Sequence, residues 1–157
     1  MSEMLTRWGA ALDRDNPLPE YPRPQLRRDS YLNLNGPWQY AFSSRADAPA
    51  RWNGEIIVPF SPEAPLSGVN RQLKKDEFLH YRRSFTLPEG FVRSRVLLHF
   101  GAVDQTARVF VNGVPAAAHH GGYWPFSADV TRALREGENE LWVVVTDNAD
   151  SPEDAYG

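Results

Sequence analysis

The amino-acid sequence predicts an all-β domain, built as an antiparallel β-sandwich or barrel. Seven or eight short segments of its 157 residues alternate apolar and polar side chains with the period of a strand. Turn-forming residues separate these segments, and the chain holds 13 prolines and 11 glycines, which favour many connections between short elements. No long helical pattern intervenes, so strands paired through turns are expected to form the core.

The N-terminal segment has a different character. Between residues 13 and 24 stand Pro17, Pro19, Pro22 and Pro24. Each lacks a backbone donor and biases the preceding residue toward extended geometry. We therefore expect an extended, proline-rich arm over residues 1–26, followed by the β-sandwich domain over residues 27–157.

The first strand signals occur between residues 30 and 60. Leu32 and Leu34 alternate with polar residues, Asn35-Gly36 marks a break, and the aromatic residues of 38–42 then recur at period two, which predicts strand, turn and strand. A short apolar run over residues 55–60 is halted by Pro59. The turn-forming residues of 61–72 then predict a loop.

The middle strands follow. Residues 78–87 alternate, but Arg83 falls in the otherwise apolar row of Tyr81 and Phe85. Because an isolated charge is costly to bury, we expect Arg83 to reach the rim of the sheet or to pair with a carboxylate. Residues 96–100 form the next alternating face, in which Val96, Leu98 and Phe100 are apolar.

The clearest local signal is a β-hairpin over residues 106–116. Ala107, Val109 and Val111 alternate before Asn112-Gly113, a dipeptide that tolerates the positive φ angles of a type I′ turn. The β-branched run of residues 140–147 predicts a strand near the sheet centre. Residues 126–139 carry the one helical pattern, which is long enough for a short helix or turn at best.

Composition excludes several classes of function. The net charge of −3 and the pI near 5.8 leave no basic surface for nucleic acid. The absence of cysteine removes disulfides, thiolate catalysis and zinc-thiolate sites. No apolar run approaches the roughly 20 residues that span a bilayer, so no membrane partner is expected. The polar N-terminus does not resemble a secretory signal, which predicts a cytoplasmic location.

The sequence offers no catalytic or metal motif. There is no Gly-x-Ser-x-Gly elbow, and none of the 20 acidic residues has a distinctive setting that would mark an acid/base pair, so we assign no catalytic residue. His119 and His120 are adjacent and make a poor metal pair, so they are expected to be solvent-facing loop residues. His80 and His99 are expected on the polar face of strands. We assign no metal and no cofactor.

An aromatic segment, Tyr123-Trp124-Pro125-Phe126, follows Gly121-Gly122. Exposed aromatic rings can stack on the C–H faces of sugars. Large aromatic side chains are more often buried, however, so we expect this segment to plug the end of the sandwich.

Several short motifs occur in one order between residues 22 and 148. They are Pro22-Arg23-Pro24, Leu32 to Trp38, Val58-Pro59-Phe60 with Ser67-Gly68, Tyr81 to Phe85, Phe100 to Asp104, Val109 to Gly113, Gly122 to Phe126 with Asp129 to Thr131, and Gly137 to Leu141. Each is weak alone. Together they resemble the N-terminal domain of glycoside hydrolase family 2, the family of β-galactosidases, β-glucuronidases and β-mannosidases.

The resemblance implies a jelly-roll sandwich of the galactose-binding-domain type. It also implies a C-terminally truncated, non-catalytic domain of a retaining β-glycoside hydrolase, whose partners are an immunoglobulin-like domain and a TIM barrel. The catalytic glutamates would stand on that barrel, beyond residue 157. In the covered region, the resemblance places the loop before Tyr81 near the carbohydrate substrate, which makes Asp76 the one candidate substrate contact. Asp104 is expected to be structural.

Two alternatives belong to other functional classes. A free-standing carbohydrate-binding module would have the same sandwich. A domain that only mediates interactions would expose an apolar patch where a neighbouring domain docks.

Overall fold

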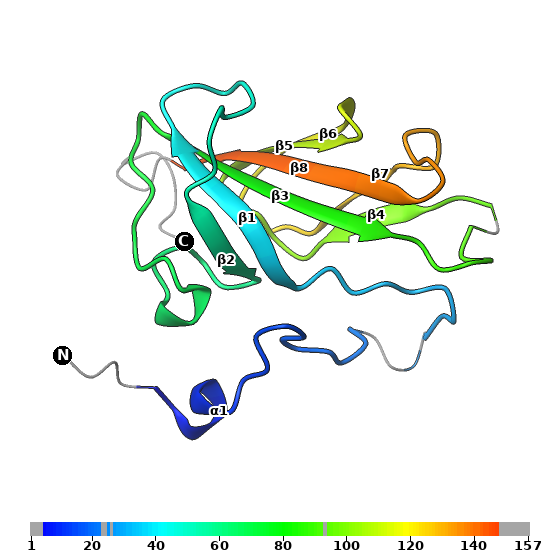
Figure 1. Ribbon diagram of the computed structural model, residues 1–157, viewed down its shortest axis with the longest axis horizontal. Coiled ribbons are helices and arrows are strands. Elements are labelled where there is room, and N and C mark those ends of the chain that lie inside the picture. The colour runs from blue at the N-terminus through cyan, green and yellow to red at the C-terminus, as the bar shows by residue number, and fades with distance from the viewer. Residues whose placement is uncertain (1–4, 23–24, 26, 93, 148–157) are drawn as a thin grey trace. The chain divides into compact units, whose positions relative to one another are not determined.

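The computed structural model describes residues 5–22, 25, 27–92 and 94–147, and its ribbon is shown in Figure 1. The elements are α1 (Arg7–Ala10), β1 (Gly36–Ser43), β2 (Gly54–Val58), the 3₁₀ turn η2 (Pro65–Ser67), β3 (Phe78–Thr86), β4 (Leu97–Phe100), β5 (Thr106–Val111), β6 (Val114–His120), β7 (Phe126–Asp129) and β8 (Glu138–Thr146). Strands dominate, which confirms the predicted all-β class. Among these residues no helix is long and apolar enough to cross a membrane.

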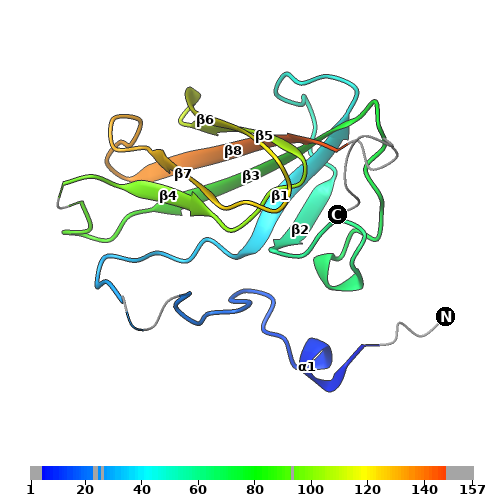
Figure 2. The ribbon, with the colours of Figure 1, turned by 180° about the vertical axis from the view of Figure 1, so that it is seen from behind.

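The chain forms two compact units, one from residues 1–38 and 55–72 and the other from residues 39–54 and 73–157. In the second unit the strands of the larger sheet follow the order β1-β3-β8-β5-β6, and β4 pairs with β7 in a smaller sheet. All of these pairings are antiparallel. Figure 2 shows β4 and β7 as a separate layer over one face of the larger sheet, so the predicted sandwich is confirmed.

The core of the second unit follows from strand alternation. Seven buried apolar side chains of the larger sheet share one face, since alternate residues of a strand point to the same side. They are Leu79, Ala107, Val109, Val111, Leu141, Val143 and Val145. The smaller sheet and the residue that follows it contribute Ala128 and Val130. We call the opposite side of the larger sheet its outer face.

The predicted hairpin is present as β5 and β6. Asn112 has a φ of 51° and Gly113 a φ of 79°, the two positive values of a type I′ turn. The Asn112 amide also links the hairpin to its surroundings, because its Nδ2 donates to the Ala133 carbonyl at 2.8 Å and its Oδ1 accepts from the Glu140 N–H at 2.9 Å. The turn is thereby tied to the start of β8.

Strand β8 lies between β3 and β5, as its β-branched sequence predicted. A buried amide shapes the loop that enters it. Asn139 is fully buried, and its Oδ1 accepts from the Arg135 N–H at 2.9 Å and from Asn112 Nδ2 at 2.8 Å. Its Nδ2 donates to the carbonyls of Arg135 at 3.0 Å and Gly137 at 3.1 Å. All the usual partners of a side-chain amide are therefore satisfied inside the protein.

Two sequence predictions are wrong in their local detail. Residues 31–35 do not form a strand: the Asn33 side chain accepts from the Asn35 N–H at 2.9 Å, and the Leu34 carbonyl accepts from Trp38 Nε1 at 2.7 Å. Side chains here satisfy backbone groups that a ladder would have used. The start of the helical candidate is instead β7, which pairs with β4, and only turns follow it.

The first unit contains the N-terminal residues and β2. Thr6 caps α1 by accepting from the Gly9 N–H at 3.1 Å. The proline-rich stretch is held by amide side chains, since Asn35 Nδ2 donates to the Pro17 carbonyl at 3.3 Å and Asn33 Nδ2 donates to the Leu18 carbonyl at 3.4 Å. The boundary between arm and sandwich at residue 26 stays a prediction.

Candidate functional site

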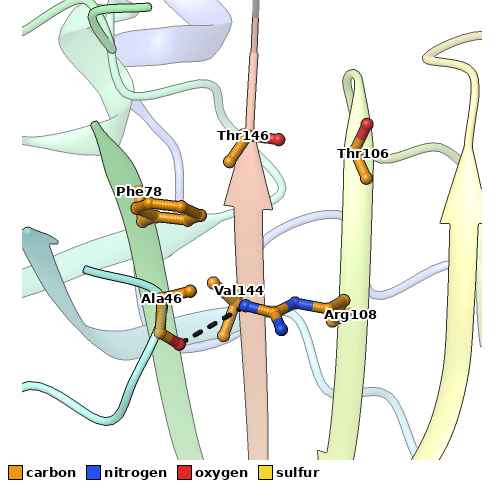
Figure 3. Close-up of a pocket in the computed structure, with 6 residues that line it drawn as sticks. All are labelled: Ala46, Phe78, Thr106, Arg108, Val144 and Thr146. Atoms are coloured by element: carbon orange, nitrogen blue, oxygen red, sulfur yellow. Dashed lines mark hydrogen bonds between the residues drawn. The ribbon is translucent and has the colours of Figure 1, made fainter. Parts of the chain in front are cut away.

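The outer face of the larger sheet carries a hollow of about 330 Å³ in the second unit. Its lining residues come from three adjacent strands and one loop, as Figure 3 shows. They are Phe78 from β3, Val144 and Thr146 from β8, Thr106 and Arg108 from β5, and Ala46 from the loop after β1. The hollow therefore combines an apolar base with a guanidinium group and two hydroxyl groups.

The strand registers explain this set. Thr106 lies opposite Thr146, and Arg108 lies opposite Val144, which in turn lies opposite His80. Alternation places these side chains on the outer face because Ala107 and its neighbours on the same side point into the core.

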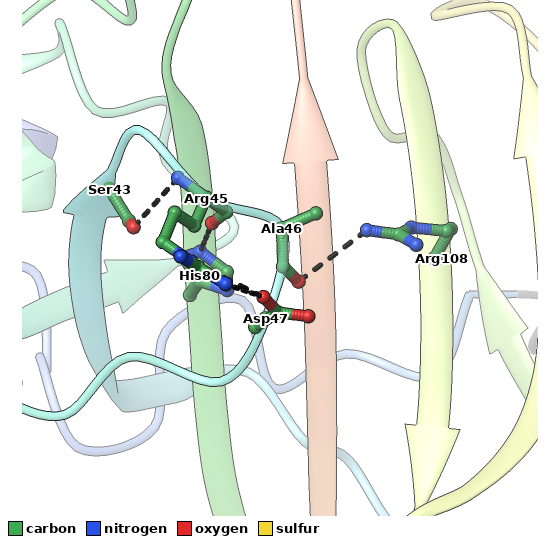
Figure 4. A network of polar contacts seen from close by, with 6 residues as sticks. All are labelled: Ser43, Arg45, Ala46, Asp47, His80 and Arg108. Atoms are coloured by element: carbon green, nitrogen blue, oxygen red, sulfur yellow. Dashed lines mark hydrogen bonds and ion pairs between the residues drawn. The ribbon is translucent and has the colours of Figure 1, made fainter.

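The loop after β1 is fixed over this face by polar contacts, drawn in Figure 4. His80 Nε2 lies 3.0 Å from the Arg45 carbonyl, and Arg108 Nη2 donates to the Ala46 carbonyl at 3.5 Å. Arg45 pairs with Asp47 at 2.8 Å in an exposed ion pair. Two neighbouring carbonyls of the loop are thus held from the sheet beneath.

His80 corrects one expectation from the sequence. It does lie on the outer face, but it is fully buried and not simply polar surface. Its ring stacks on Trp142 with centroids 5.9 Å apart, and Trp142 Nε1 donates to His80 Nδ1 at 3.3 Å. These contacts define the neutral tautomer with the proton on Nε2, which donates to the Arg45 carbonyl. Burial, with a further contribution from the Arg108 charge, lowers the pKa of His80.

The other histidines have structural surroundings. His99 is exposed on β4 and lies 2.6 Å from Ser127 Oγ, as expected for the polar face of a strand. His119 and His120 are in strand β6, so the predicted loop position is wrong, whereas His120 is exposed as predicted. His119 is half-buried and stacks on Phe126 with ring centroids 4.2 Å apart. The long pairing of β5 with β6 extends the hairpin beyond the point where the sequence predicted its end.

The structure places Asp76 in an exposed turn immediately before β3. The turn is closed by its neighbours, since the Glu77 N–H donates to the Lys74 carbonyl at 3.0 Å and Glu77 Oε2 accepts from the Lys74 N–H at 3.3 Å. Asp76 does not line the hollow. Its role as a substrate contact stays a prediction.

The aromatic segment after β6 differs from its prediction. Tyr123 is 61% exposed and Trp124 is 71% exposed, so these two rings do not plug the sandwich. Phe126 alone packs inward, stacked on Phe100 with centroids 4.7 Å apart. Phe126 begins strand β7 and is half-buried, whereas Tyr123 and Trp124 precede the strand and are exposed.

Asp104 lies against the backbone of Gly122. A Cβ atom on Gly122 would collide with the Asp104 carboxylate, so only glycine fits there. The close approach supports the structural role predicted for Asp104. It also explains why Gly122 stands in the turn before the exposed aromatic rings.

No group of three or more metal-ligating side chains occurs among the described residues. The acidic residues Asp150, Glu153 and Asp154 lie outside the described residues. Among the described residues we also assign no pair of carboxylates to general acid/base catalysis.

Sequence reasoning missed the hollow. Alternation alone places Thr106 and Arg108 on the face opposite Ala107, and that signal was available in the sequence. The order of the strands in the sheet was not available from the sequence. Only the pairing of β5 with β8 and of β8 with β3 brings Thr146, Val144 and Phe78 beside them.

The smaller antiparallel sheet over the larger one defines the class of the protein as a β-sandwich domain. Comparison with known proteins agrees. The family described as "Glycosyl hydrolases family 2, sugar binding domain" matches residues 68–153. The chain belongs to this family.

Curated relatives are mainly β-glucuronidases. The chain is 29% identical to a β-glucuronidase of Paenibacillus borealis over 80% of its own length and 22% of the relative. It is 31% identical to the β-glucuronidase of Felis catus over 74% of its length and 20% of the relative. A β-galactosidase of Thermoanaerobacter pseudethanolicus is 30% identical over 73% of the chain and 16% of the relative. The chain thus spans about a fifth of the length of these proteins.

Solved structures give the same result. A Faecalibacterium prausnitzii β-glucuronidase is 33% identical with a TM-score of 0.60, over 73% of this chain and 20% of that one. A Lactobacillus rhamnosus β-glucuronidase is 28% identical with a TM-score of 0.63, over 73% and 21% of the two chains. A Dictyoglomus thermophilum β-D-mannosidase, 22% identical with a TM-score of 0.61 over 76% and 16%, shares the fold.

Proposed function

We propose that this chain is the N-terminal, non-catalytic domain of a longer family 2 enzyme that hydrolyses terminal β-glycosidic bonds. The observation that carries the proposal is the match to the family's sugar-binding domain, together with relatives of which the chain covers only 22% and 20%. In the complete polypeptide the domain would pack on an immunoglobulin-like domain and a TIM barrel, and the barrel would supply the acid/base and nucleophilic glutamates of a retaining mechanism.

The domain's own part would be to shape one edge of the sugar pocket. Asp76 is the candidate contact, because an exposed carboxylate can accept hydrogen bonds from sugar hydroxyl groups and its turn leaves it accessible. Hydrogen bonds to a charged partner contribute about 1.5–3 kcal/mol, so their loss would lower kcat/KM by about tenfold or more.

The test is a kinetic comparison in the full-length polypeptide. Asp76→Ala is expected to lower kcat/KM for a nitrophenyl β-glycoside, whereas Glu89→Ala, which removes an exposed acid from another turn, is expected to have no effect. Unchanged kcat and KM in Asp76→Ala would eliminate Asp76 as a substrate contact.

One observation favours a second candidate, a carbohydrate-binding module. The ring of Trp124 is 71% exposed and can stack on the face of a sugar. Titration calorimetry of the isolated chain with soluble β-glycans distinguishes the candidates: a binding module releases or absorbs heat, and Trp124→Ala abolishes that signal. Trp8→Ala is the matched control, since Trp8 is 69% exposed in α1. A pocket-edge domain gives no heat of binding that depends on Trp124.

A further inference from the structure

The guanidinium group of Arg108 is the main feature of the hollow on the outer face. It extends from β5 across Val144 of β8 toward the loop after β1, as Figure 3 shows. It donates one long hydrogen bond, 3.5 Å from Nη2 to the Ala46 carbonyl. Among the described residues no carboxylate lies within ion-pair distance of it. The planar, bidentate donor set of Arg108 is thus available to an added acceptor.

Two hydroxyl groups lie beside Arg108 on the same face of the sheet. Thr106 and Thr146 lie opposite each other in the register of β5 and β8, two residues from Arg108 and Val144 respectively. Thr106 Oγ1 is 3.0 Å from His120 Nδ1, which fixes its orientation, and both hydroxyls border the hollow. Each hydroxyl can donate and accept, as sugar hydroxyl groups require of a partner.

The remaining walls are apolar. Val144 is buried and forms the base, and the ring of Phe78 forms one side. A hollow of about 330 Å³ is larger than a simple anion such as acetate needs, and it lies at the lower end of the range for small-molecule sites. A ring of six atoms with C–H groups on its faces suits an aromatic wall beside an aliphatic base.

We propose that this hollow binds a sugar residue that carries a carboxylate, with the carboxylate on Arg108, ring hydroxyls on Thr106 and Thr146, and the ring against Phe78 and Val144. The proposal is independent of the proposed function, because it concerns binding by this chain and requires no hydrolysis. It adds a ligand class that neither the fold nor the exposed aromatic turn defines.

The surroundings favour a negatively charged ligand over a neutral one. Arg45 and Asp47 form an ion pair nearby, so their charges neutralise each other. The positive charge of Arg108 acts on His80 and contributes to the lowered pKa of that histidine. A carboxylate can form paired, charge-assisted hydrogen bonds with this exposed cation, which a neutral sugar cannot.

The test is a ¹⁵N NMR titration of the 157-residue chain with methyl β-D-glucuronide, methyl β-D-glucoside and acetate. The first two ligands differ only in a carboxylate against a hydroxymethyl group. We expect the glucuronide to shift the amide signals of residues 106–108 and 144–146. The glucoside and acetate are expected to bind at least about tenfold more weakly. The glucoside cannot form the charged hydrogen bonds, and acetate has no sugar ring.

Variants assign the effect to the hollow. Arg108→Gln is expected to weaken glucuronide binding about tenfold or more, and Thr146→Val by a smaller factor. Arg132→Gln removes an exposed arginine from the turn after β7 and is expected to leave binding unchanged. Thermal melting verifies that each variant is folded.

Three results would overturn the proposal. The first is the absence of localised shifts with the glucuronide. The second is equal binding of glucuronide and glucoside, or of glucuronide and acetate. The third is binding that survives in folded Arg108→Gln.

Discussion

Replacement of Asn139 by alanine is expected to destabilise the domain strongly. The side chain is fully buried and forms four hydrogen bonds, two as acceptor and two as donor. In Asn139→Ala the N–H and carbonyl of Arg135 and the carbonyl of Gly137 lose their partner, whereas Asn112 Nδ2 retains its bond to the Ala133 carbonyl. At about 1 kcal/mol for each of three groups, the expected loss of unfolding free energy is about 3 kcal/mol.

Urea denaturation followed by the fluorescence of the five tryptophans measures this loss. A domain of this size should melt about 6–12 °C lower for about 3 kcal/mol. Glu136→Ala changes an exposed side chain of the same loop and should stay within about 0.5 kcal/mol of the wild type. A loss below about 1 kcal/mol in Asn139→Ala, with an unchanged denaturant slope, would refute the reasoning.

Asn139→Asp changes the hydrogen-bonding groups of the side chain but keeps its shape. The aspartate keeps the size of the side chain but turns an oxygen toward the carbonyls of Arg135 and Gly137, which now face a carboxylate. We expect it to be at least as unstable as Asn139→Ala at neutral pH and to approach the wild type as the carboxyl group protonates at acidic pH. A stability difference that does not depend on pH would contradict this assignment of donors.

Three further predictions concern the histidine network and two glycines. The pKa of His80 is lowered in the folded state, so the unfolded chain binds the proton more readily. The free energy of unfolding should therefore fall as the pH drops below about 6.5 toward the folded-state pKa. In urea titrations at several pH values, His80→Gln should show a weaker dependence of stability on pH. An unchanged slope would mean that other groups cause it. Gly122→Ala places a methyl group against the Asp104 carboxylate and should lower the melting temperature. Asp104→Ala in the same chain should relieve this effect in part, because the Cβ of residue 104 remains 3.0 Å from the added atom. Gly113→Val forces a β-branched residue to a φ of 79° and should destabilise the hairpin by about 1–3 kcal/mol in the same denaturation assay, although the added side chain meets open space.

The sequence predicted elements whose signals are local. Alternation found β5 and β8, and Asn112-Gly113 predicted the turn conformation, because one residue pair determines the favoured φ angles. Leu32 and Leu34 misled the same reasoning, since the Asn33 side chain closes a turn that competes with the ladder. Strand β7 was missed because its four residues are stabilised mainly by pairing with distant β4.

The candidate site depended more on long-range structure. His80 is buried because a loop 35 residues earlier in the chain folds over it and offers the Arg45 carbonyl. The hollow requires side chains from three strands whose order the alternation pattern does not specify. Strand alternation predicted the sandwich and the family resemblance implied its jelly-roll type, but the contacts around Arg108 came only from the folded chain.

The most direct test of the central claim is the hydrolysis of nitrophenyl β-D-glucuronide, β-D-galactoside and β-D-mannoside by the purified 157-residue chain. If the chain is a non-catalytic sugar-binding domain, nitrophenol is released at the rate of buffer alone at every protein concentration. Circular dichroism of the same sample verifies that the chain is folded. Release that increases in proportion to the concentration of the chain, and that disappears when the chain is thermally unfolded, would contradict the account.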